Sequence, residues 1–199
     1  MKNNNQISKK TKSTWLNYFR PNLFLKSYSD LNLFTLKKNG IRVLICDLDN
    51  TLAPHFTRLP NQKAKKFVTD VQELGIKFIV VSNNTKTRVE EFSKELKPDH
   101  YIWNAKKPLI SKIKGVMEKY SVEPEELIIL GDQFITDVWA ANRIGCKSIL
   151  VLPVVDQAKG AGSSLLIKFL DKFIYQKLQH NNISIAKDDS ISGEPYVLL

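Results

Sequence analysis

Residues 41–52 decide the fold, and they read IRVLICDLDNTL. Residues 41–46 form a short apolar run rich in β-branched side chains, which is typical of a buried strand. Asp47 and Asp49 follow directly, where the backbone can turn and both carboxylates can face one pocket. The stretch therefore predicts a buried strand that presents two acidic groups at its carboxyl end.

Beyond this stretch, short apolar runs alternate with segments in which apolar residues recur at helical spacing. Further strands are expected at residues 76–81, 100–103, 127–130 and 147–152. Helices are expected to begin near Pro60, Thr85, Pro108 and residue 135. This alternation predicts an α/β fold of three layers, Rossmann-like, with a five-stranded parallel sheet. Ligands of such sheets bind at the carboxyl ends of the strands.

Three more groups of polar residues follow the other expected strands. They are Ser82-Asn83-Asn84, then Lys106-Lys107-Pro108, and then Gly131-Asp132 with Asp137 further on. Each group alone has a structural explanation, as a helix cap, a solvated lysine pair or an acidic helix start. Because all of them fall at the ends of successive strands, we expect them to share one site.

The residue types in this site suit phosphoryl transfer with a magnesium ion. Asp47 can act as nucleophile and metal ligand, and Asp49 as the acid that later activates water. A hydroxyl and backbone N–H groups at Ser82 can cradle a phosphate, and a fixed lysine can neutralise crowded negative charge. Asp132 can join Asp47 on the metal, while Asp137 can hold Lys107 or a metal-bound water.

The order of these residues resembles the haloacid dehalogenase (HAD) superfamily over residues 41–155. The strings at residues 47–52, 82–84, 107–109 and 131–138 are similar to the YqeG family of HAD phosphatases. That family is related to the HAD-type phosphatidylglycerophosphate phosphatases of mitochondria. The resemblance implies an aspartyl-phosphate on Asp47, with Asp49 as general acid and then general base.

The resemblance also implies a role for each remaining residue of the motifs. It implies a magnesium ion held by Asp47, by the backbone carbonyl of Asp49 and by Asp132. It implies phosphate binding by Thr51, Ser82 and Asn83, charge stabilisation by Lys107, and a supporting contact from Asp137. Lys106 is the weaker candidate for the lysine, because the family's lysine directly precedes the proline.

The spacing of the motifs leaves no room for a cap domain. Ser82 lies 35 positions after Asp47 (82 − 47), and Lys107 lies 25 positions after Ser82 (107 − 82). The expected loops, helices and strands use up both intervals. We therefore expect an open pocket, which suits a phosphate attached to a large molecule such as a phospholipid headgroup or a nucleic acid end.

Charge and composition leave the partners open. The chain carries a net charge of +10, and residues 1–40 hold eight basic residues against one acidic residue, or +7. Aromatic and basic residues interleave over residues 14–38, which fits either two short helices packed on the core or an interfacial element. The alternative to a lipid phosphatase is a basic RNA- or membrane-binding protein with weak or vestigial phosphatase activity.

The expected organisation has three parts. Residues 1–39 form a basic tail and amphipathic segment, residues 40–156 the catalytic domain, and residues 157–199 a flexible joint, an amphipathic helix and a tail. The two cysteines form no disulfide framework or zinc motif. We expect a cytoplasmic protein, with peripheral contact at the inner face of the membrane as an open possibility.

Overall fold

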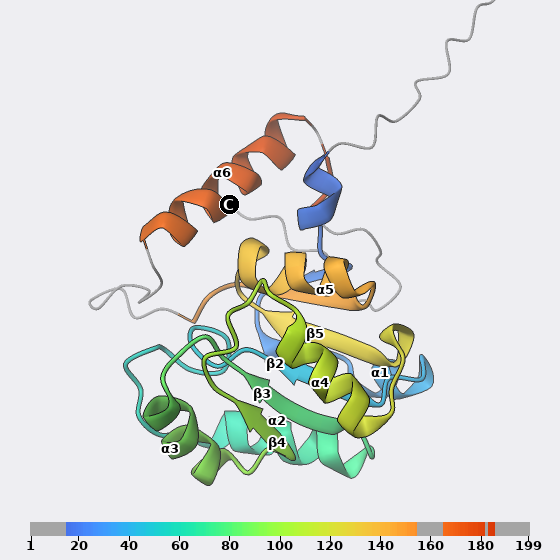
Figure 1. Cartoon of the computed structure of the whole chain (residues 1–199), viewed down its shortest axis with the longest axis vertical. Helices are drawn as coiled ribbons and strands as arrows, with labels where there is room; N and C mark the ends of the chain where they lie inside the picture. Colours follow the sequence, from blue (N-terminus) through green and yellow to red (C-terminus); the bar gives the residue numbers. More distant parts are fainter. Residues whose placement is uncertain (1–14, 155–164, 182, 186–199) are drawn as a thin grey trace, which may run out of the picture.

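The computed structural model describes residues 15–154, 165–181 and 183–185. A sheet of six strands lies at its centre, in the order β1-β6-β5-β2-β3-β4, and every neighbouring pair is parallel (Figure 1). The strands are β1 (Leu23–Leu25), β2 (Val43–Cys46), β3 (Lys77–Val81), β4 (His100–Ile102), β5 (Leu127–Gly131) and β6 (Lys147–Val151).

The prediction of five strands was wrong by one, because β1 was missed. Leu23 pairs with Ile149 of β6, and all three residues of β1 are buried. An apolar run of three residues close to Pro21 is too short to reveal a strand by its periodicity. Since β1 belongs to the same sheet as β2, the sheet crosses the boundary that was expected at residue 40.

Helices cover both faces of the sheet and confirm the three layers. On one face lie α1 (Leu33–Lys38), α2 (Gln62–Glu73) and α3 (Lys86–Leu96); on the other lie α4 (Ser111–Tyr120) and α5 (Trp139–Ile144). Successive side chains of each strand point to opposite faces of the sheet. Leu44 packs in the α1–α3 layer, whereas its neighbours Val43 and Ile45 pack against α4 and α5.

Local capping explains where two of these helices begin. Asn61 Oδ1 accepts a hydrogen bond from Ala64 N at 2.8 Å, and Thr85 caps α3 in the same way. Pro108 was expected in the first turn of a helix, but α4 begins only at Ser111. The peptide bond before Pro108 is cis, and the backbone closes a separate turn first, from Leu109 N to Lys106 O at 2.8 Å.

A third apolar cluster lies at the β1 end of the sheet. It joins η1 (Trp15–Phe19), α5, α6 (Leu165–His180) and the π-helical turn η4 (Phe134–Val138). The helix expected from residue 135 to residue 144 is thus a π-turn followed by α5. Short 3-10 turns also occur at η2 (Tyr28–Asp30) and η3 (Pro124–Glu126).

The expected amphipathic helix after residue 164 is α6. The predicted tail at residues 1–13, the predicted flexible joint and the end of the chain beyond residue 185 lie outside the described residues. In the part of the chain that is described, no helix is both long enough and apolar enough to cross a bilayer.

Candidate active site

The predicted site residues meet at the carboxyl ends of four strands. The chain runs from β2 to β3 and β4 on one side, and then returns to β5 on the other side of β2. A crevice is expected at such a reversal of strand order. A cavity of about 360 Å³ lies there. It is lined by Asp47, Asp49, Asn50, His55, Ser82, Asn83, Asn84, Lys107, Gln133, Thr136 and Ile167.

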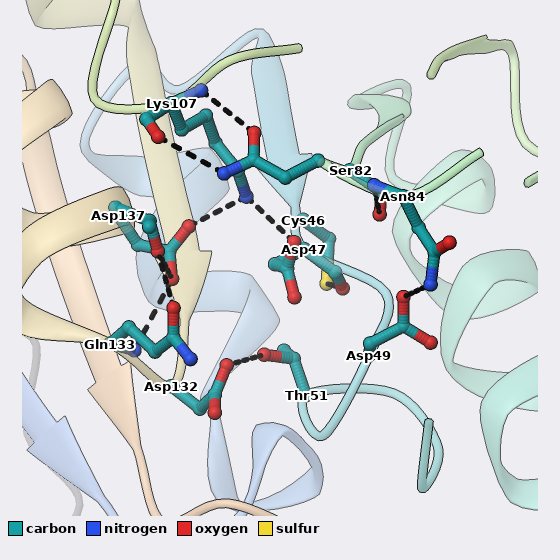
Figure 2. A network of polar contacts seen from close by, with 12 residues as sticks. Cys46, Asp47, Asp49, Thr51, Ser82, Asn84, Lys107, Asp132, Gln133 and Asp137 are labelled. Carbon is teal, nitrogen blue, oxygen red and sulfur yellow. Dashed lines mark hydrogen bonds and ion pairs between the residues drawn. The ribbon is translucent and has the colours of Figure 1, made fainter. Parts of the chain in front are cut away.

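Lys107 links the carboxylates of Asp47 and Asp137 (Figure 2). Its Nζ is 2.7 Å from Asp47 Oδ1 and 2.7 Å from Asp137 Oδ1, and its side chain is 1% exposed. Burial alone would lower the pKa of Lys107, but the carboxylates of Asp137 and Asp47 outweigh it and raise that pKa above its ordinary value. Lys107 therefore carries a fixed positive charge beside the carboxylate of Asp47.

Asp137 holds Lys107 from within the turn η4. Its Oδ2 accepts hydrogen bonds from Gln133 N at 3.2 Å and from Thr136 Oγ1 at 3.0 Å, while Oδ1 faces the lysine. The carboxylate packs so tightly against Gly131 that a β-carbon at position 131 would collide with it. Glycine at this strand end therefore makes room for Asp137, a reason that the sequence did not reveal.

Asp47 and Asp132 are carboxylates whose negative charge is costly in this site. Burial raises the pKa of Asp47 to about 7; Asp137 adds to the rise, and Lys107 opposes it. Burial and then the charges of Asp47 and Asp137 raise the pKa of Asp132 well above its ordinary value. Thr51 Oγ1 donates to Asp132 Oδ1 at 3.1 Å and orients that carboxylate.

The donor set fits a magnesium ion that shares its coordination with water and phosphate. Within the described residues, no group of three or more His, Cys, Asp or Glu side chains is arranged to hold a metal by itself. Asp47 and Asp132 could supply hard oxygen ligands, and the backbone carbonyl of Asp49 could be a further oxygen donor. Magnesium typically binds to one or two carboxylates and a substrate phosphate and keeps several waters. A divalent cation would also offset the crowding of negative charge.

Arg88 is a contact of Asp49 that sequence reasoning missed. Its Nε and Nη2 lie 3.1 and 3.0 Å from Asp49 Oδ1, and Asn84 Nδ2 donates to Asp49 Oδ2 at 2.8 Å. Arg88 also donates through Nη1 to the carbonyl of Thr57. In the sequence it reads as one more cation in the first turn of α3, three residues after the cap Thr85. Only the fold brings it to the loop that follows β2.

The three residues expected to bind phosphate have different contacts. Asn83 binds the backbone of Lys107 at both ends of its amide: Nδ2 donates to Lys107 O at 3.0 Å, and Oδ1 accepts from Lys107 N at 2.7 Å. The hydroxyl of Thr51 is used on Asp132. Ser82 Oγ accepts from Asn84 N at 3.1 Å and keeps its own proton to donate. Of these three, Ser82 keeps its hydroxyl proton and Asn83 keeps the second N–H of its amide as side-chain donors for phosphate.

Two further lining residues carried no signal in the sequence. His55 comes from the loop after β2, and Ile167 comes from α6, more than 80 residues beyond Ser82. Between Asp47 and Ser82 the chain forms only a loop, α2 and β3, and between Ser82 and Lys107 it forms only α3, β4 and short loops. No cap domain is therefore inserted in either interval, as expected. The cavity is instead bordered on one side by α6.

A parallel sheet with this set of aspartates and a buried lysine at its carboxyl edge defines a phosphatase of the HAD superfamily. Residues 7–155 match the family model described as mitochondrial PGP phosphatase, and the chain belongs to that family. The "Probable phosphatase YqeG" of Bacillus subtilis is 33% identical over 137 residues, which are 69% of this chain and 79% of that protein. A copper-transporting ATPase of Helicobacter pylori is 29% identical over 112 residues, or 14% of its own length.

Solved structures show more distant likenesses. The 3-deoxy-D-manno-octulosonate 8-phosphate phosphatase of Moraxella catarrhalis, in complex with magnesium, phosphate and KDO, has a TM-score of 0.45 at 14% identity and covers 73% of this chain and 91% of its own. An uncharacterized protein from Listeria monocytogenes has a TM-score of 0.46 at 19% identity, covering 65% and 99%. At these scores the likenesses carry no further argument.

Proposed function

We propose that this phosphatase hydrolyses the terminal phosphomonoester of phosphatidylglycerophosphate, in a magnesium-dependent reaction through an aspartyl-phosphate on Asp47. The observation that carries the chemistry is the pairing of Asp47 Oδ1 with the buried Lys107 Nζ at 2.7 Å, beside Asp132. The description of the family supports the substrate. So does the absence of an inserted cap between β3 and α3.

The first step forms the covalent intermediate. Lys107 binds Oδ1 of Asp47, so we assign the attack on phosphorus to Oδ2. As the new bond forms, the bond between phosphorus and the glycerol oxygen breaks, and Asp49 gives its proton to that oxygen. Lys107 stabilises the negative charge that crowds between the phosphoryl group and Asp47.

The second step regenerates the enzyme. A water molecule attacks phosphorus, Asp49 takes a proton from this water, and Asp47 leaves as a carboxylate. In both steps the hydroxyl of Ser82 donates a hydrogen bond to a phosphoryl oxygen. Asp47, Asp132 and the carbonyl of Asp49 would hold the magnesium ion, which supplies charge neutralisation for the transferring phosphoryl group.

The test is phosphate release from phosphatidylglycerophosphate in mixed micelles, with magnesium and with a chelator. Wild type should release phosphate only with magnesium, and Asp47→Asn should release none. Asp70→Asn is the matched control, because Asp70 pairs with Lys66 on the exposed side of α2 and should keep full activity. Full turnover by Asp47→Asn would refute the mechanism. Hydrolysis of a soluble aryl phosphate without release from the lipid would refute the substrate.

A further inference from the structure

Helix α6 exposes a stripe of large apolar side chains. Leu166, Phe169 and Phe173 are spaced three and four residues apart, so they share one side of the helix. Their exposed fractions are 64%, 67% and 39%, whereas Ile174 and Leu178 on the opposite side are buried in the third apolar cluster. The helix is thus apolar on two sides, and on one of them Leu166 and Phe169 are largely exposed.

The turn η1 extends this stripe. Trp15 stacks on Phe173, with 6.3 Å between ring centroids and 15° between ring planes, and Trp15 is itself 48% exposed. Tyr18 is 60% exposed on the same turn. Figure 1 shows η1, the blue turn, beside α6 at the outer edge of the molecule. We call Trp15, Tyr18, Leu166, Phe169 and Phe173 the α6–η1 face.

The exposed charged side chains of α6 are basic. The helix carries Lys168, Lys172 and Lys177, and the Lys177 ammonium lies 5.4 Å from the centre of the Phe173 ring. Its one acidic residue, Asp171, accepts a hydrogen bond from Ile135 N at 3.1 Å and so faces the protein. An apolar stripe edged by lysines is complementary to a lipid surface with negative headgroups.

The same helix connects this face to the active site. Ile167 lines the catalytic cavity, one residue from the exposed Leu166. A second cavity, of about 420 Å³ and mostly apolar, lies along α6, and Lys168 and Lys172 are among the residues that line it. Gln133 lines both cavities. A surface bound to the α6–η1 face would therefore lie close to the mouth of the catalytic cavity.

We propose that the α6–η1 face docks on an anionic lipid bilayer and brings the catalytic cavity to the level of the headgroups. The proposal rests on the proposed function, because a substrate held in a bilayer must be reached from its surface. A bilayer explains both the exposed Leu166 and Phe169 and the lysines around them. An RNA strand would use the lysines and aromatic rings but not the leucine.

The test measures sedimentation of the full chain with vesicles. Phosphatidylcholine vesicles that contain phosphatidylglycerol should bind wild type more tightly than phosphatidylcholine alone. The double variant Leu166→Ser/Phe169→Ser should bind the anionic vesicles at least about tenfold more weakly, because two exposed apolar side chains no longer enter the interface. Phe34→Ser is the matched control: Phe34 is 76% exposed on α1, away from this face, and its loss should change nothing.

A second pair of readouts separates docking from catalysis. Asp47→Asn should bind vesicles as wild type does, and the double variant should hydrolyse a soluble aryl phosphate at the wild-type rate. Two results would overturn the proposal. The first is equal vesicle binding by wild type and the double variant, whether or not salt abolishes it. The second is a wild-type dimer that the double variant converts to monomer in light scattering.

Discussion

Thr51 is fully buried, and its hydroxyl donates a hydrogen bond to Asp132 Oδ1. Thr51→Val keeps the shape of the side chain and removes only this donor. Asp132 then loses the contact that orients it, so the magnesium concentration for half-maximal activity should rise about tenfold or more, since losing the partner of a metal ligand typically weakens metal affinity about 10–100-fold. A magnesium titration of activity measures this. An unchanged midpoint would show that Thr51 does not act through Asp132.

Arg88 holds Asp49 by two guanidinium nitrogens, and Asn84 holds the other oxygen. Arg88→Gln should lower kcat about tenfold or more, because misplacing an acid–base group costs rate even when the group is present. Arg58→Gln is the control, since Arg58 is 83% exposed and pairs with Glu91 at the surface. Steady-state kinetics of both variants on a soluble aryl phosphate make the comparison. A wild-type kcat in Arg88→Gln would show that Arg88 does not position Asp49 for catalysis.

Strand β5 ends at Gly131 because a β-carbon there would collide with Asp137, and two substitutions test this. Gly131→Ala should lower the free energy of unfolding by about 2 kcal/mol or more and abolish activity, because the new β-carbon displaces Asp137 and with it Lys107. Gly115→Ala in α4 meets nothing within 4 Å and should be neutral or stabilising by up to about 1 kcal/mol. Urea unfolding of both variants measures this. Equal stability of the two would contradict the packing described for Asp137.

How well each element could be predicted depended on the range of the forces that form it. The strand before Asp47 and the cap at Thr85 are local patterns, and both were predicted. β1 depends on pairing with β6, more than 120 residues away, and its three residues show no period. The π-turn that carries Asp137 looks like ordinary helix in sequence, so its role in placing that carboxylate stayed hidden.

In the site, too, the residues that follow local sequence patterns were predicted, and those placed by long-range contacts were missed. Asp47, Asp49, Lys107 and Asp132 were predicted because each follows a strand within a few residues along the chain. Arg88 was missed because it approaches Asp49 from a helix 39 positions away. Ile167 was missed because α6 reaches the cavity only through the packing of the whole molecule.

At the scale of the whole molecule, Asp171 joins α6 to the turn η4 and makes stability depend on pH. Burial raises the pKa of Asp171 to about 7, from an ordinary value of 3.8. Between these values the folded chain keeps a proton that the unfolded chain has lost. The contribution of Asp171 to stability is therefore fully present below about pH 4 and is lost as the pH rises to about 7.

Asp171→Asn keeps an acceptor for Ile135 N–H but does not titrate. The stability of the variant relative to wild type should therefore increase from pH 4 to pH 7, by on the order of 1–2 kcal/mol. Urea unfolding of both proteins across this range measures the difference, in which the other buried carboxylates cancel. A difference that stays constant with pH would show that Asp171 does not hold its proton in the folded protein.

An aspartyl-phosphate on Asp47 is the intermediate on which the proposed function depends, and it can be trapped. Wild-type enzyme is mixed with phosphatidylglycerophosphate and magnesium, quenched in acid within the first turnover and reduced with borohydride, which converts an aspartyl-phosphate to homoserine. Peptide mass spectrometry should then find homoserine at position 47 in wild type and none in Asp47→Asn. Turnover without homoserine at position 47, or homoserine at another aspartate, would contradict the assignment of Asp47 as the nucleophile.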